Sequence, residues 1–183
     1  MRSHPQRIPT LMILAALVIA ASAQVWSQRP PSDKAQERIE REVRHELVML
    51  PYYGVFDNLA FKVQGSTVTL LGQVVLPPLK SNAEAALKRI EGVEKVINQI
   101  EVLPASPADD SIRLKVYRAI YSEGALERYA LYAIPSVHII VRGGKVTLEG
   151  VVAREMDKNI ANIRAKGVPG VFSVTNNLRV EKS

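Results

Sequence analysis

Apolar residues recur along the chain with two alternating periods. Ile39, Val43 and Leu47 fall four apart among polar residues, which predicts one face of an amphipathic helix. Further along, the period changes to two, which predicts half-buried strands. The expected elements are a helix over residues 34–50, strands over 59–63 and 68–74, a helix over 79–90 and a strand over 96–102. Their order is helix–strand–strand–helix–strand.

The same order of elements occurs a second time. When residues 59–102 are aligned with residues 137–180, 15 of the 44 positions are identical without a gap. The first helices of the two copies match at an offset of 73 rather than 78, so the second copy has five extra residues before its first strand. Such a match indicates internal duplication. The first helix of the second copy is expected to be capped by Asp109 or Asp110 and to run to about Tyr121.

Glycines separate the predicted strands in both copies. Gly65-Ser66 and Gly143-Gly144 each stand between two strands, where a two-residue hairpin turn requires positive φ. Lys145 follows the second pair, but a phosphate-binding loop would lead from a strand into a helix N-terminus. We therefore expect a hairpin with an exposed lysine. The expected structural turn glycines are Gly65, Gly72, Gly92, Gly143, Gly144, Gly150 and Gly170.

The N-terminus resembles a secretory signal. Arg2 and Arg7 precede an apolar run over residues 11–21, and Ala21-Ser22-Ala23 offers a cleavage site before Gln24. The alternative is a retained membrane anchor, although the run is about half of the ~20 residues that a spanning helix needs. The predicted organisation is a signal peptide (1–23), a proline-containing linker (24–32), a first domain (33–103), a second linker (104–109) and a second domain (110–182).

Both copies carry a G-x-V-T-L-x-G hairpin and a later G-V-x-x-V-x-N strand, and this combination resembles the BON domain. The first copy has residues 65–72 and 92–98, and the second has 143–150 and 170–176. The first copy's turn is one residue longer than the tightest pattern of the family. The resemblance implies an α+β fold of two tandem BON domains, each helix–strand–strand–helix–strand with a three-stranded sheet covered by two helices.

A signal peptide followed by tandem BON domains resembles the osmotically inducible periplasmic type of this family. The resemblance implies periplasmic residence, no catalysis, and binding to phospholipid or envelope surfaces in support of envelope integrity under osmotic or other envelope stress. The chain lacks the acylated cysteine of the lipoprotein branch, so we expect a secreted protein that is membrane-associated without a lipid anchor.

The residue inventory favours no catalytic or metal site. The chain has no cysteine, which excludes disulfides, thiol nucleophiles and Cys-ligated zinc. His45 and His138 lie in different copies without metal-ligand spacing, so we expect them at the surface or a packing boundary. No G-x-S-x-G or P-loop motif is present. We expect no enzyme activity, no cofactor and no metal.

Charge and aromatic residues concentrate in the second copy. Residues 109–182 hold 12 basic and 8 acidic residues, against 9 and 10 in residues 33–103. Tyrosines beside arginines suit a lipid headgroup layer, since the ring is apolar and the hydroxyl is wet. The candidate lipid-binding residues are Arg113, Tyr117, Arg118, Tyr121, Arg128 and Tyr129. The alternative is that these tyrosines pack an interface between the two domains.

The sequence therefore predicts an exported, non-catalytic protein that binds anionic phospholipid or an envelope surface. The alternative is a periplasmic protein–protein adaptor that docks through a sheet edge or the inter-domain surface. An envelope protein partner is compatible with either prediction. Nucleic acid is not an expected partner, because the net charge of +6 is modest and the expected compartment is wrong.

Overall fold

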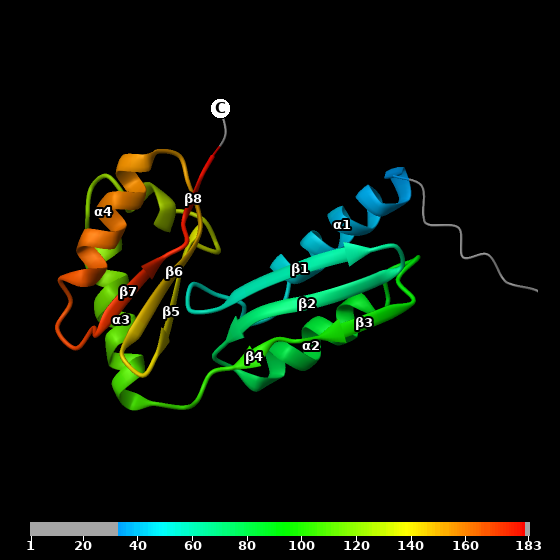
Figure 1. Ribbon diagram of the computed structural model, residues 1–183, viewed down its shortest axis with the longest axis horizontal. Coiled ribbons are helices and arrows are strands. Elements are labelled where there is room, and N and C mark those ends of the chain that lie inside the picture. Colours follow the sequence, from blue (N-terminus) through cyan, green and yellow to red (C-terminus); the bar gives the residue numbers. More distant parts are fainter. Residues whose placement is uncertain (1–32, 182–183) are drawn as a thin grey trace, which may run out of the picture.

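The computed structural model describes residues 33–181, and the predicted signal peptide and first linker lie outside them. The described chain forms two units along the long axis of the molecule (Figure 1). Each unit combines two α-helices with one small sheet, so the predicted α+β fold of two repeats is confirmed. Among the described residues, no helix is both long enough and apolar enough to span a membrane.

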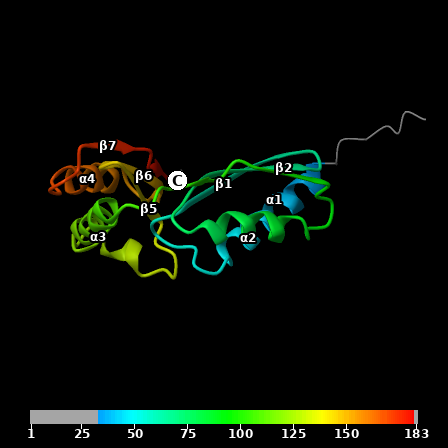
Figure 2. The same ribbon diagram turned by 90° about the horizontal axis from the view of Figure 1, so that it is seen from below.

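The first domain is a sheet with helices on one side. Its elements are α1 (Asp33–Val48), β1 (Asn58–Gln64), β2 (Thr67–Val74), α2 (Pro77–Leu87), β3 (Lys95–Asn98) and β4 (Glu101–Val102). β1 pairs antiparallel with β2, whereas β3 and β4 both pair parallel with β2. β1 is therefore one edge of the sheet, and Figure 2 shows α1 and α2 on the same side of it.

The second domain repeats this topology with one addition. Its elements are α3 (Pro107–Tyr121), the 3-10 helix η1 (Glu127–Ala130), β5 (Val137–Arg142), β6 (Lys145–Val152), α4 (Glu155–Lys166), β7 (Ser173–Asn176) and β8 (Arg179–Val180). Strand registers are identical, since Phe61 faces Leu70 in the first domain and Ile139 faces Leu148 in the second. The added η1 lies in the longer connection that the duplication predicted.

Each domain has its own apolar core. The stripe predicted on the first helix is buried at Ile39, Val43 and Leu47, and its counterpart on α3 is buried at Ile112, Val116 and Ile120. The central strands complete the cores: Leu70 and Leu148 have no exposed surface. Burial of each such side chain contributes about 1.5–3 kcal/mol.

The last predicted strand of each copy is two short strands, because an asparagine interrupts it. The side-chain Oδ1 of Asn98 accepts a hydrogen bond from the amide of Ile100 (3.2 Å), and its Nδ2 donates to the carbonyl oxygen of Lys80 (2.8 Å). Asn176 makes the same two bonds, to Leu178 (3.2 Å) and Lys158 (2.9 Å). The asparagine thus joins the strand break to the preceding helix in both domains.

The first helix of the second domain starts earlier than predicted. Ser106, not Asp109 or Asp110, is the N-cap, and its hydroxyl accepts from the amide of Asp109 (3.2 Å). α3 therefore begins inside the predicted linker. Asp109 is buried and has another role: its carboxylate accepts hydrogen bonds from the amides of Gly143 (2.8 Å) and Gly144 (2.9 Å). The hairpin amides that could attract an anion are occupied by this carboxylate.

The hairpin glycines have the conformation that the sequence predicted. Gly65, Gly143 and Gly144 have φ of 64°, 57° and 73°. Gly150 lies within β6 rather than at its end, with φ of 117°, and a Cβ there would stand 2.0 Å from the carbonyl oxygen of Ser136. Gly72 has the same relationship with Asn58. These two positions require glycine because the neighbouring strand approaches too closely for any side chain.

Candidate functional site

The six candidate lipid-binding residues lie on α3 and η1 of the second domain, but they do not share one surface. Arg113, Tyr121 and Tyr129 are buried, Tyr117 is half-buried, and Arg118 and Arg128 are exposed. A buried side chain that is hydrogen-bonded within the domain cannot reach a headgroup in this conformation. The surroundings of each residue therefore decide which of them remain available to a ligand.

Arg113 and Tyr121 bind the edge of the second sheet. Arg113 Nη2 donates to the carbonyl oxygen of Val141 (2.8 Å), and its Nη1 pairs with Asp110. The Tyr121 hydroxyl donates to the carbonyl oxygen of Val137 (2.6 Å). Burial raises the pKa of Tyr121 above its usual range, so the phenol stays protonated and donates. Both side chains satisfy strand carbonyls that water would otherwise solvate.

Arg128 and Tyr129 join η1 to the start of α4 through Asp157. The Tyr129 hydroxyl donates to the buried Asp157 carboxylate (2.6 Å) and accepts from the amide of Ala153 (2.8 Å). Arg128 pairs with the same carboxylate, and its guanidinium carbon lies 4.8 Å from the centre of the Tyr129 ring. Asp157 was not among the candidates, because nothing in its sequence neighbourhood marks it as the partner of a residue 28 positions earlier.

Tyr117 lies at the junction between the two domains. Its ring meets the ring of Phe56 edge-on, with the two ring centroids 6.2 Å apart. The centroid of the Tyr121 ring lies 4.7 Å from that of Tyr117 on the same helix. Phe56 and Val55 belong to the first domain in sequence but pack against the core of the second. The alternative in which tyrosines pack the domain interface thus holds for Tyr117.

The junction is made by residues 53–57, here called the junction segment. Its central contact is a backbone hydrogen bond from the amide of Ile139 on β5 to the carbonyl oxygen of Val55 (2.8 Å). An ion pair between Arg142 and Glu101 connects the domains at a second point. The first domain therefore extends a loop onto the edge of the second sheet, and the two sheets do not stack.

His138 faces the junction segment. Its ring stacks on Tyr53 with centroids 5.6 Å apart and lies against the backbone of Gly54 and Asp57. Burial lowers the pKa of His138, and the imidazole Nδ1 has no hydrogen-bond partner within the described chain. Asp57 is also buried, which raises its pKa, and its carboxylate accepts from the amides of Val75 (2.8 Å) and Gly54 (3.1 Å). The sequence predicted His138 at the surface or at a packing boundary, and the structure has it at the boundary between the domains.

One face of α3 remains open to a ligand. Arg118 lies four residues after Leu114 and three after Lys115, and all three side chains are exposed, Leu114 to 48%. In the part of the chain that the structure describes, neither Lys115 nor Arg118 takes part in an ion pair. α4 packs against α3 and exposes Met156 (68%) and Ile163 (67%). This helical side of the second domain combines uncompensated positive charge with apolar side chains.

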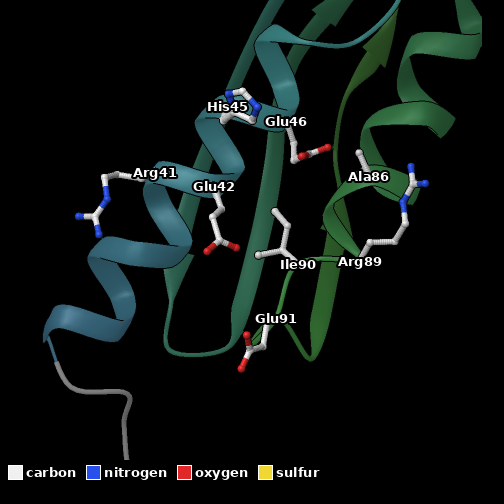
Figure 3. A pocket seen from close by; sticks show the side chains of 8 residues that line it. All are labelled: Arg41, Glu42, His45, Glu46, Ala86, Arg89, Ile90 and Glu91. Carbon is white, nitrogen blue, oxygen red and sulfur yellow. The ribbon is translucent and has the colours of Figure 1, made fainter.

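The first domain has a groove between α1 and α2, of about 810 Å³ (Figure 3). It is lined by Arg41, Glu42, His45, Glu46, Ala86, Arg89, Ile90 and Glu91. Glu42 is already paired with Arg38, and Arg41 points away from the groove. Among residues 33–181 no cluster of three His, Asp or Glu side chains could hold a metal ion. The mixed charges are those of a solvated helix surface.

Comparisons with known proteins identify both repeats. The family model described as BON domain matches residues 35–104 and again residues 108–182. No curated protein matches the chain.

Two solved structures are similar to the chain over most of its length. One is the C-terminal domain of CdsD, described as the structural protein of the type III secretion system of Chlamydia trachomatis. It is 10% identical, with a TM-score of 0.32 over 78% of this chain and 96% of that one. Another structure of CdsD is also 10% identical, with a TM-score of 0.28 over 80% and 93% of the two chains. TM-scores below 0.5 do not carry a conclusion about function.

Proposed function

The chain belongs to the BON domain family, and on that premise we propose that it is a non-catalytic, exported envelope protein whose second domain binds anionic phospholipid. The family consists of binding domains associated with membranes, phospholipid or stress functions. Export rests on the signal-like residues 1–23, which lie outside the described residues. In this role the protein supports the integrity of the envelope under osmotic or related stress, from the periplasm.

The observation that carries the proposal is the exposed face of α3. Lys115 and Arg118 are free of carboxylate partners within the described chain, and the exposed Leu114 lies one turn of the helix before Arg118 on the same side. A cation next to an exposed apolar side chain suits the boundary between headgroups and acyl chains. Each basic residue near an anionic surface contributes about 1 kcal/mol, so the face provides a modest and reversible attraction.

The first domain lacks an equivalent face. At the offset of 73 that relates the first helices, Leu114, Lys115 and Arg118 correspond to Arg41, Glu42 and His45. Glu42 would be repelled by an anionic surface and is paired with Arg38. The difference between the two copies therefore supports the second domain as the lipid-binding one.

The test is cosedimentation with liposomes of phosphatidylglycerol and of phosphatidylcholine. We expect binding to the anionic liposomes only, with an affinity that falls as salt is added, because salt screens exposed charges. The variant Lys115→Ala with Arg118→Ala removes the proposed contacts and should lose most of the binding. The matched control, Arg41→Ala with Lys62→Ala, removes the same charge from the first domain and should bind normally. If both double variants lost the same amount of liposome binding, net charge alone would explain the binding, and the assignment to this face of α3 would be contradicted.

The buried candidates need separate treatment. Alanine at Arg113, Tyr121 or Tyr129 would disturb the sheet edge or the Asp157 cluster, so any loss of lipid binding there must be compared with the stability of the variant. Arg118 is the predicted residue whose loss reports lipid contact most directly. If Arg118→Ala binds as the unchanged protein does, while the salt dependence persists, the lipid site lies on another surface.

A further inference from the structure

The edge of the second sheet is closed by the chain itself. The three residues of β5 whose backbone groups point away from β6 are Val137, Ile139 and Val141, and one outward group of each is hydrogen-bonded. Tyr121 donates to Val137, Val55 accepts from Ile139, and Arg113 donates to Val141. Three such contacts along one edge cover the strand and obstruct its pairing with another chain.

The equivalent edge of the first sheet is open at Phe61, whereas the Tyr53 hydroxyl lies beside the backbone of Leu59. The carbonyl of Leu70 accepts from Gln99 on the far side of β2, so Phe61, which faces Leu70, directs its amide and carbonyl away from β2. At the offset of 73, the positions of Arg113 and Tyr121 hold Glu40 and Val48, which cannot donate to a strand carbonyl. Within residues 33–181 the backbone groups of Phe61 at this edge have no hydrogen-bond partner.

The second domain carries an unused counterpart of the junction segment. The carbonyls of Asn58 and Ser136 approach Gly72 and Gly150 identically, which fixes the two strands in register. At the offset of 78 that relates the strands, residues 131–135 of the second domain correspond to residues 53–57 of the first. Within this loop Leu131 is 80% exposed and Tyr132 is 66% exposed. The chain thus forms one such junction within itself. It also carries an uncovered strand edge, at Phe61 of β1, and an exposed loop over residues 131–135, which correspond to the two sides of that junction.

We propose that the open edge of β1 binds residues 131–135 of another copy of this chain, head to tail. In the internal junction Val55 meets Ile139, Tyr53 meets His138 and Phe56 meets Tyr117. The corresponding pairs between copies are Ala133 with Phe61, Leu131 with Ala60, and Ile134 with Arg44, whose guanidinium lies over the Phe61 ring. Most of these contacts are apolar, and they would remove the exposed side chain of Leu131 from water.

Charge favours this pairing of unlike domains. The first domain holds 9 basic and 10 acidic residues and the second holds 12 and 8, so second-to-first contacts join opposite net charges, whereas second-to-second contacts repel. Two different surfaces meet in a head-to-tail interface, so copies form a closed ring or an open row according to the rotation between them. The proposal is independent of lipid binding, which uses the exposed face of α3.

The chain has no cysteine, so single cysteines can test the contact without background. Ala60→Cys and Leu131→Cys replace two exposed residues that the proposal places opposite each other in different copies, where a disulfide can form. Mixed and oxidised, the two variants should give mainly the mixed dimer, located by mass spectrometry of the linked peptides. Phe172→Cys, also highly exposed, replaces Leu131→Cys in the control mixture and should not cross-link above the level of random collision.

Sedimentation velocity provides the second measurement, on the mature full chain without any cysteine. The unchanged protein should sediment faster as its concentration rises, and Leu131→Ser with Tyr132→Ser should abolish that rise while circular dichroism stays unchanged. Phe172→Ser should leave it intact. Predominant Ala60→Cys homodimers would overturn the proposal in favour of β1–β1 pairing. A concentration-independent monomer, or a Leu131 and Tyr132 variant that loses liposome binding but still associates, would overturn it as well.

Discussion

The amide of Ile139 in the second domain donates a hydrogen bond to the carbonyl oxygen of Val55 in the first, with 2.8 Å between nitrogen and oxygen. This single backbone contact lies at the centre of the junction, between the Tyr53–His138 stack and the Phe56–Tyr117 pair. The first domain therefore supplies part of the second domain's edge, and the two repeats are coupled despite their separate cores.

Phe56→Ala should loosen this junction. Phe56 is half-buried and packs against the second core, so we expect a loss of about 1–3 kcal/mol in the free energy of unfolding of the second domain. Small-angle scattering should show a larger radius of gyration, because the domains gain freedom to move. Phe172→Ala removes a ring that is 81% exposed and is the control. An unchanged scattering profile in Phe56→Ala would show that other contacts hold the domains.

Arg113→Ala should destabilise the second domain, although a charged residue on a helix is usually replaceable. The change leaves the carbonyl of Val141 without its donor inside a buried site, which costs about 1–3 kcal/mol. Urea unfolding followed by circular dichroism measures the difference. Arg118→Ala, five residues along the same helix and exposed, should unfold at the same urea concentration as the unchanged protein. Equal stability of the two variants would contradict the edge role of Arg113.

The stability of the protein should fall as the pH drops below about 6.5, because of His138. Burial lowers the pKa of His138 in the folded chain below its ordinary value of 6.5, so the unfolded chain binds a proton at a pH where the folded chain does not. The contribution is therefore fully present above pH 6.5 and is lost as the pH falls through the lowered pKa. Tyr53, Asp57 and Glu149 are the titratable groups that face the ring.

His138→Gln isolates this contribution from other titrations. Asp57 is present in both proteins, and its raised pKa acts in the opposite direction, because the folded chain binds this proton more readily than the unfolded chain does. Unfolding midpoints at several pH values between 5 and 8 should show a smaller slope in the variant than in the unchanged protein. Parallel slopes would mean that His138 does not titrate differently on folding.

Gly150→Ala should be strongly destabilising. The position has a φ of 117°, and the added Cβ would stand 2.0 Å from the carbonyl oxygen of Ser136, so the strand must shift. We expect a loss of about 2 kcal/mol or more from the backbone conformation and the displaced strand pair. Gly124→Ala is the matched control, because a Cβ there meets nothing within 4 Å. Thermal unfolding compares the two variants, and similar midpoints would contradict the steric requirement.

Local pattern accounts for most of the fold. The apolar spacing of Ile39, Val43 and Leu47 located a buried helix face, and the glycines at the hairpins marked turns that only positive φ permits. These features depend on neighbours a few residues away. Because the two copies share that local sequence, the elements of one copy predict those of the other. Boundaries were less accurate where a side chain competes with the backbone: Asn98 interrupts the last strand, and Ser106 caps α3 before Asp109.

The candidate site was predicted less completely, because helical spacing gives the direction of a side chain but not what it meets. Arg113 and Arg118 are both arginines of α3, yet one meets a strand carbonyl 28 residues away and the other meets solvent. Likewise Tyr129 finds Asp157 only when η1 folds against α4. Residue type suggested a headgroup layer for all six candidates, and only packing distinguishes the exposed residues from those that bind the domain's own backbone.

By itself the sequence determined the duplication, the order of elements, the two cores and the turns, since all of these follow from periodicity and from backbone preferences. Tertiary structure alone decided that the junction segment lies on the edge of β5, and that β1 has no such cover. The physical reason is that an edge strand must satisfy its outward amides and carbonyls, and the groups that do so come from distant parts of the chain. No local pattern encodes that pairing.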